Sequence, residues 1–277
     1  MKRLRFLEPE RHKLELAQGK IALLSGCGAG LGRDTALLLA QEGADLVISA
    51  RRPDEIDKIA EEVRALGRQC LPVVGDITKL ADCERITEMA IEKFGRIDIL
   101  VNIAYKADWP KRMKLMECEP DLSNWRDCFE VNTFATMQMT RQVAQHMIRQ
   151  RSGKIVMINT MTAEKVQPGA YAYAGSKIAL QRMSQILAME LGEYNIRVNS
   201  MHPGWMVGPQ NLKVMSSRAE QNGTTVEEER ALVAKETALG YLASTEEYAR
   251  VVLFLASPLA DAMTGQSLHV NAGQYFY

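Results

Sequence analysis

A regular alternation of short apolar runs with longer segments of helical period constrains this chain more than any other feature. The short runs predict strands at residues 20–25, 45–49, 70–74, 98–102, 154–159, 196–201 and 267–270. The segments between them predict helices at 30–42, 54–66, 79–93, 122–150, 171–193 and 245–256. Strands separated by helices of this length need crossover connections, so we expect an α/β fold with a doubly wound parallel sheet.

Length and composition predict one globular domain over residues 1–277. The 34 basic residues balance 34 acidic ones, so we expect neither nucleic acid nor a membrane surface as partner. No apolar run reaches the length of a membrane span, and the first residues are charged, unlike a secretory signal. Five cysteines without a C-x-x-C pair fit a reduced, cytoplasmic protein.

Three stretches lie outside the alternation. Residues 1–15 form an N-terminal extension. Residues 103–121 and 205–244 each follow the carboxyl end of an expected strand, the edge where open α/β sheets bind ligands. We therefore expect both to line a substrate site, although runs of charge usually face water. The first of them carries four cations, Lys106, Lys111, Arg112 and Lys114.

A glycine-rich turn joins the first expected strand to the first expected helix. Glycines allow a tight turn and close approach to a pyrophosphate, and a helix N-terminus offers free N–H groups. The spacing is not G-x-G-x-x-G, and no Gly-Lys-Ser/Thr follows as in a Walker loop. A tight connection alone also explains glycines, but this position favours dinucleotide binding. The turn reads Ser25-Gly26-Cys27-Gly28-Ala29-Gly30-Leu31-Gly32.

Tyr173 and Lys177 lie four residues apart in the helix expected at 171–193, so they share one face. A tyrosine needs its pKa lowered by roughly three units, or about 4 kcal/mol, to transfer protons near neutrality. One cation at about 4 Å in a partly shielded site supplies about that much. For the spacing alone, a surface pair without function is the favoured explanation, so the assignment depends on motifs elsewhere in the chain.

Together these motifs resemble the short-chain dehydrogenase/reductase family over about residues 16–273. The family carries T-G-x-x-x-G-x-G, N-N-A-G, a catalytic Asn, a catalytic Ser and Y-x-x-x-K in this order. The resemblance implies a single-domain Rossmann-type fold, a nicotinamide cofactor and a homotetramer or homodimer. The matching residues are Ser25, Gly26, Gly28, Gly30, Leu31, Gly32, Asn102, Ala104, Asn132, Tyr173, Lys177, Pro203 and Gly204.

The resemblance also implies a reaction, the interconversion of a secondary alcohol and a ketone. A hydride passes between the nicotinamide and the carbonyl carbon while Tyr173 gives a proton to the oxygen. Lys177 lowers the pKa of Tyr173 and bonds the ribose, and Asn132 holds a water in a proton relay. Thr160 stands where the family has its catalytic serine and keeps the hydroxyl that orients the substrate oxygen, with Thr162 as the reserve candidate.

The end of the second expected strand bears on the cofactor. Where the family binds the ribose 2′-hydroxyl of NAD through an acidic residue, this chain has Ala50, followed by Arg51 and Arg52. We therefore expect NADP(H), with NAD as the alternative. The resemblance places Asp76 and Ile77 near the adenine, although Asp76 is also suited to capping the next helix.

Two kinds of function follow. The first is an oxidoreductase for a small carbonyl or alcohol substrate, resembling either 3-oxoacyl reductases or cyclic-alcohol and hydroxysteroid dehydrogenases. The second is a catalytically silent nucleotide-binding or regulatory protein. Four departures from the family motivate it: Thr160, Ile103, Tyr105, and Gly208 in place of a threonine that bonds the nicotinamide.

The histidines give no sequence signal for a metal. None of the four lies in H-E-x-x-H or at a ligand spacing from a cysteine, so we expect no metal site. His202, beside Pro203, is interpreted as a packed, hydrogen-bonded side chain.

Overall fold

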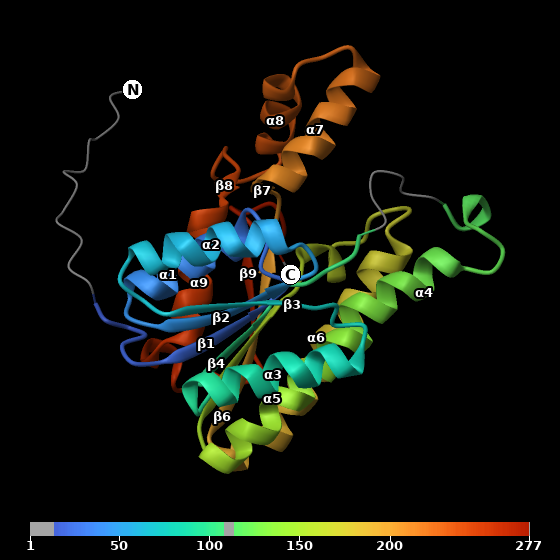
Figure 1. Cartoon of the computed structure of the whole chain (residues 1–277). Helices are drawn as coiled ribbons and strands as arrows, with labels where there is room; N and C mark the ends of the chain where they lie inside the picture. Colours follow the sequence, from blue (N-terminus) through green and yellow to red (C-terminus); the bar gives the residue numbers. More distant parts are fainter. Residues whose placement is uncertain (1–13, 108–113, 277) are drawn as a thin grey trace.

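The computed structural model describes residues 14–107 and 114–276, and its centre is a seven-stranded sheet in which every neighbouring pair is parallel (Figure 1). The strand order β3-β2-β1-β4-β5-β6-β9 reverses between β1 and β4. All seven expected strands are present, and the expected doubly wound α/β fold is confirmed. The strands are β1 (Ile21–Ser25), β2 (Asp45–Ala50), β3 (Cys70–Val74), β4 (Ile99–Asn102), β5 (Gly153–Ile158), β6 (Ile196–Pro203) and β9 (Ser267–Val270).

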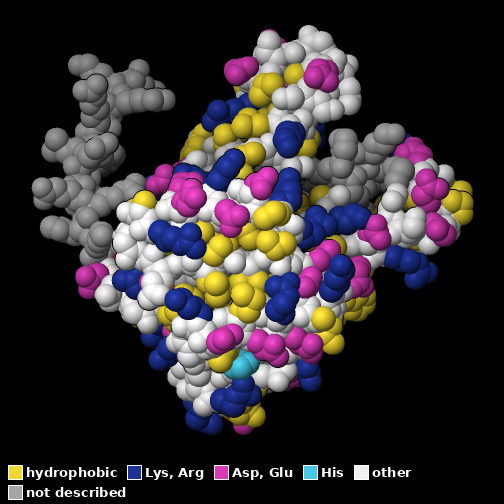
Figure 2. Space-filling model, viewed as in Figure 1, with side chains coloured by type: hydrophobic (Ala, Val, Ile, Leu, Met, Phe, Trp, Pro, Cys, Tyr) yellow, Lys and Arg dark blue, Asp and Glu magenta, His cyan; other side chains and the backbone are white. Residues whose placement is uncertain are grey.

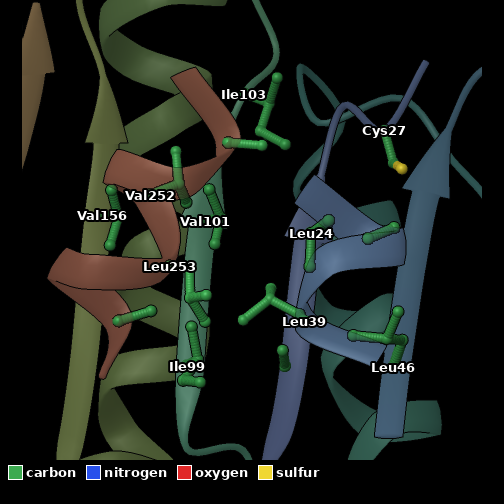
Figure 3. Close-up of a cluster of buried hydrophobic side chains, with 14 of the residues drawn as sticks. Leu24, Cys27, Leu39, Leu46, Ile99, Val101, Ile103, Val156, Val252 and Leu253 are labelled. Carbon is green, nitrogen blue, oxygen red and sulfur yellow. The ribbon is translucent and has the colours of Figure 1, made fainter. Parts of the chain in front are cut away.

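Helices cover both faces of the sheet, which is why its strands are apolar on both sides. One face packs against α1 (Leu31–Gln41), α2 (Pro53–Ala65) and α9 (Thr245–Ala256). There Leu24 and Val101 of the sheet lie among Leu39 of α1 and Val252 of α9 (Figure 3). The other face packs against α3 (Leu80–Phe94), α5 (Thr136–Gln150) and α6 (Tyr171–Leu191).

The helix expected at 122–150 is not continuous. The chain forms α4 (Ser123–Phe129), then a π-helical segment from Glu130 to Ala135, and then α5. A π turn widens the helix locally and leaves composition almost unchanged, so apolar periodicity does not reveal it. Such turns often occur at functional sites, and this one contains Asn132.

Residues 205–244 form a small two-helix unit, which we call the lid. It projects from the carboxyl edge of the sheet (Figure 1) and contains α7 (Pro209–Asn222) and α8 (Val226–Ala234). Two short paired strands, β7 (Met206–Val207) and β8 (Ala243–Ser244), form its base. Met215, Val233 and Leu242 make a core separate from the two cores on the main sheet. Residues 205–244, which the sequence places outside the strand–helix alternation, therefore form a unit with a small core of its own.

The surface in view carries both signs of charge. Figure 2 shows Lys and Arg interspersed with Asp and Glu over this face, in line with equal numbers of each in the sequence. Within the described ranges, no helix has the length and apolarity that crossing a membrane requires.

Gly26 and Gly67 provide a matched pair for testing close packing at the first turn. Both have positive φ, +82° and +80°, but a Cβ at Gly26 would lie 2.4 Å from the Cα of Ala104, whereas a Cβ at Gly67 would meet no atom within 4 Å. We expect Gly67→Ala to cost about 1 kcal/mol of unfolding free energy from backbone strain alone. Gly26→Ala should cost about 3 kcal/mol or more, because overpacking adds to that strain. Urea unfolding measures both, and equal losses would contradict the close contact.

Candidate functional site

The residues expected to form the site gather at the carboxyl edge of the sheet. Because strand order reverses between β1 and β4, the connections after these strands leave in opposite directions and open a crevice between them. Each strand from β1 to β6 ends at or just before one of the expected residues. Ser25 ends β1, Arg51 follows β2, Asp76 follows β3, Asn102 ends β4, Thr160 follows β5 and Pro203 ends β6.

The glycine turn and the segment after β4 are bound to each other. The carbonyl oxygen of Ser25 accepts hydrogen bonds from the backbone N–H groups of Ile103 and Ala104, at 2.8 and 3.0 Å. The backbone at Ala104 leaves no room for a side chain at Gly26. Ala104 and Gly26, which the resemblance assigned to two separate motifs, therefore form one joint.

The turn also meets the needs of a dinucleotide. Gly30 has φ +90° and directly precedes Leu31 and Gly32, the first residues of α1, so the first N–H groups of the helix face the crevice. Ser25 Oγ and Asn102 Oδ1 are buried and make no hydrogen bond with any described residue. Buried polar atoms are nearly always bonded, so these two fit a polar ligand at the crevice.

The two arginines after β2 differ in their surroundings. Arg52 pairs with Glu55 at 2.7 Å, and Glu55 lies close to the glycine turn, 3.4 Å from where a Cβ of Gly28 would be. Arg51 is exposed and makes no ion pair with the described residues. Of the two, Arg51 is the one whose charge is available to an anionic ligand.

Asp76 caps the turn that it begins. Its Oδ1 accepts hydrogen bonds from the backbone N–H and the hydroxyl of Thr78, at 3.1 and 2.9 Å. The neighbouring Ile77 is buried against the core on the α3 side. The capping interpretation of Asp76 accounts for these contacts.

Lys177 is buried one helical turn after Tyr173 on α6. Its Nζ donates to the carbonyl oxygen of Ile158 at 2.8 Å, and its own carbonyl accepts from Asn159 Nδ2 at 3.1 Å. Burial lowers the pKa of Lys177 from 10.5 to about 7. Tyr173 is half-buried, and its ring centre lies 6.4 Å from that of Tyr105. The pair therefore lies on a covered face of the helix and not on its outer surface.

Asn132 joins three segments of the site. Its Oδ1 accepts from the backbone N–H of Lys106, and its Nδ2 donates to the carbonyl of Lys106 and to Ser176 Oγ, at 2.8, 2.8 and 2.9 Å. Ser176 lies inside the Tyr173–Lys177 motif but was not singled out from the sequence. Its spacing, three residues after Tyr173, is the signal that places it on the adjoining helix face.

Thr160 occupies the expected position after β5. Its side chain is 7% exposed, and its Oγ1 accepts from the backbone N–H of Thr162 at 3.2 Å. That bond uses an oxygen lone pair, so the hydroxyl hydrogen can be donated to another oxygen. Thr162 is also buried and lies within the short helical turn that follows, Met161–Ala163.

Close packing against Thr245 explains why position 208 is a glycine. A Cβ there would lie 2.9 Å from Thr245 Cγ2, so a larger residue would clash. The hydroxyl of Thr245 donates to Asp34 Oδ2 at 2.5 Å, which holds the threonine in place at the start of α9. Thr245, which the sequence did not single out, fills the space beside Gly208.

His202 is packed, as expected, but the expected hydrogen bond is limited to a contact with the Thr160 backbone that falls short of hydrogen-bond geometry. The ring is fully buried, and neither ring nitrogen makes a hydrogen bond with the described part of the chain. Burial, with smaller contributions from His269 and Lys177, lowers the pKa of His202 to about 3. The imidazole is therefore neutral at physiological pH.

The cations expected after β4 are only partly described. Lys106 forms an ion pair with Asp127, and both side chains are exposed. Lys111 and Arg112 lie outside the described residues. The exposed ion pair supports the interpretation of Lys106 as a solvated surface residue.

Comparisons with known proteins agree with this arrangement. Residues 26–274 match the family model described as enoyl-(acyl carrier protein) reductase. The chain is 31% identical to 3-oxoacyl-(acyl-carrier-protein) reductase of Thermotoga maritima, over 92% of this chain and 98% of that protein. It is also 31% identical to 7alpha-hydroxysteroid dehydrogenase of Escherichia coli, over 92% and 94%. The crystal structure of L-sorbose reductase from Gluconobacter frateurii, complexed with NADPH and L-sorbose, superposes with a TM-score of 0.86 at 28% identity, covering 93% and 97%.

The burial of Lys177 predicts a pH-dependent stability. Its pKa is lowered on folding, so the unfolded chain binds the proton more strongly between about pH 7 and 10.5, and wild-type stability should rise with pH over this range. Lys177→Met removes the buried charge and should raise the unfolding free energy at pH 7 by about 3 kcal/mol. Urea unfolding should show this gain shrinking towards pH 10. The exposed Lys58→Met is the control, and a gain independent of pH would contradict the charge assignment.

Proposed function

The chain belongs to the short-chain dehydrogenase/reductase family, and we propose that Tyr173, Lys177, Thr160 and Asn132 form the catalytic centre of an NADP(H)-preferring member. The protein is an NAD(P)-dependent oxidoreductase that interconverts a secondary alcohol and a ketone. The observation that carries the assignment of residues is the buried Lys177, one helical turn from Tyr173 at the mouth of the crevice.

The cofactor, when bound, supplies or takes up the hydride at the carbonyl carbon. In the reduction direction, Tyr173 gives its phenolic proton to the oxygen, which becomes the alcohol hydroxyl. The ammonium of Lys177, held by the Ile158 carbonyl, stabilises the phenolate that remains. The Thr160 hydroxyl donates to the same substrate oxygen and fixes its position.

Asn132 acts in this proposal as a positioning residue. The amide binds Lys106 and Ser176, so it connects the segment after β4 to the helix that carries Tyr173. The relay water implied by the family resemblance remains a prediction.

The cofactor would lie across the joint between Ser25–Gly26 and Ala104. We propose that the pyrophosphate sits at the N-terminus of α1 and the adenosine 2′-phosphate at Arg51. The related L-sorbose reductase was crystallised with NADPH, which supports this choice over NADH. Pro203 and Gly204 at the end of β6 would border the nicotinamide, and Asp76 with Ile77 the adenine.

Among substrates, we propose a free cyclic alcohol or ketone ahead of a carrier-bound 3-oxoacyl group. An anionic carrier would need exposed cations beside the crevice, and of the two cations that the structure describes after β4, Lys106 is already paired with Asp127 and Lys114 is exposed. The pocket would lie between the segment after β4 and the lid.

We further propose a cytoplasmic homotetramer. None of the five cysteines forms a disulfide with a described residue, as expected in a reducing compartment. Ile178, Ile186 and Met189 are exposed apolar side chains on α6, at 42%, 51% and 84%, and a second copy of the chain would cover them.

Replacing Tyr173 by Phe tests the proton donor. We expect the rate of NADPH-dependent reduction of a cyclic ketone to fall at least about 1000-fold, because the hydroxyl is lost, with NADPH affinity retained. Tyr171→Phe is the matched control: Tyr171 lies on the same helix, stacks on Trp125, and should keep its activity. Substantial reduction by the Tyr173 variant would refute the assignment. NADPH binding by wild type without turnover across a broad ketone screen would instead support the silent regulatory protein.

Replacing Arg51 by Ala tests the cofactor preference. Loss of a charge-assisted bond to the 2′-phosphate should weaken NADPH binding by roughly 10- to 100-fold, since such bonds contribute about 1.5–3 kcal/mol. NADH binding should stay the same. Fluorescence titration of both nucleotides measures this, with the exposed Arg250→Ala as control. Equal losses for the two nucleotides would place the 2′-phosphate elsewhere.

A further inference from the structure

Two histidines and a carboxylate meet beside the catalytic residues, although they are far apart in the sequence. Position 202 on β6 pairs in register with position 269 on β9, which brings the two imidazole ring centres to 4.8 Å. Glu164 ends the short turn that follows Thr160, and its Oε2 lies 3.1 Å from His269 Nε2. One ligand atom from each of the three residues lies within 4.8 Å of the others.

His202 is the member of this cluster that lacks an explanation. It is 0% exposed, and both ring nitrogens lack a hydrogen-bond partner among the described residues, although the Thr160 backbone lies near the ring. A buried imidazole normally bonds through at least one nitrogen. One nitrogen of this ring lies within 4.8 Å of a carboxylate oxygen of Glu164 and of a ring nitrogen of His269. One metal ion placed between these three atoms would contact all of them.

The carboxylate is already oriented from outside the cluster. Glu164 Oε1 accepts a hydrogen bond from Gln181 Nε2 on α6 at 2.6 Å, while Oε2 faces His269. Carboxylates that bind metals are commonly held by such an outer hydrogen bond. A surface cleft lined by residues 267–273, 275 and 276 includes His269, so one member of the cluster borders the surface.

We propose that Glu164, His202 and His269 bind one divalent transition-metal ion, best matched by Zn²⁺. Two imidazoles and one carboxylate are a common zinc ligand set, whereas Mg²⁺ and Ca²⁺ prefer oxygen ligands alone. The ion would replace the contact between Glu164 and His269 and tie the segment after Thr160 to β6 and β9. This role is structural, and it does not depend on the proposed catalytic residues.

The test is metal binding by the full chain after treatment with a chelator. Isothermal titration calorimetry with Zn²⁺ should show that one equivalent binds per chain. Co²⁺ bound at the same site should give a visible absorption band and no thiolate charge-transfer band. His202→Ala and His269→Ala should abolish binding, and Glu164→Gln should weaken it at least about tenfold. His146→Ala is the control, since His146 lies on α5 beside Arg149, away from the cluster.

The outcomes separate cleanly. Zn²⁺ should also raise the thermal unfolding midpoint of wild type and leave that of the histidine variants unchanged. Absence of binding by wild type, binding that survives both histidine substitutions, or a thiolate charge-transfer band would overturn the site. Circular dichroism checks the fold of each variant. Glu164→Gln keeps the size of the side chain at a partly exposed position, so this variant should fold. Its Zn²⁺ affinity therefore tests the site even if a histidine variant misfolds.

Discussion

The joint between the first and fourth strands is the constraint on which the rest of the site depends. Two backbone N–H groups, from Ile103 and Ala104, share the carbonyl oxygen of Ser25, and Gly26 lies directly against Ala104. This joint sits at the reversal of strand order, so it sets the floor of the crevice. The residue types that depart from the family here, Ile103 and Tyr105, leave the joint intact because the contact is made by backbone atoms.

A buried cation, Lys177, lies at the carboxyl edge of the sheet beside the proposed proton donor Tyr173. Lys177 is buried and its Nζ donates to the carbonyl oxygen of Ile158, and burial of the charge lowers the pKa of the ammonium and destabilises its charged form. The hydrogen bonds of Asn132 and Asn159 fix the same helix from two sides, through Ser176 and through the carbonyl of Lys177. The helix therefore has little freedom to move the tyrosine away from the crevice.

Local features of this site were predictable from the sequence, and features that depend on topology were not. The strands follow from apolar runs, and the shared helix face of Tyr173 and Lys177 follows from their spacing, because both signals lie within a few residues. The π turn around Asn132 leaves no such signal, since it changes hydrogen bonding and not composition. Thr245 beside Gly208, and His202 beside His269, meet only through tertiary packing and strand register.

The small separate core of the lid determines which of its residues can change without affecting the sheet. Met215, Val233 and Leu242 form the lid's own core, while its base joins the body through Ala243 in the main core and through backbone hydrogen bonds from residues 238 and 239 to the segment after β9. Substitutions in α7 and α8 away from this base therefore change the lid with little effect on the sheet. In the proposed function, substrate choice and reaction chemistry therefore depend on different parts of one chain, the lid for the first and the edge of the main sheet for the second.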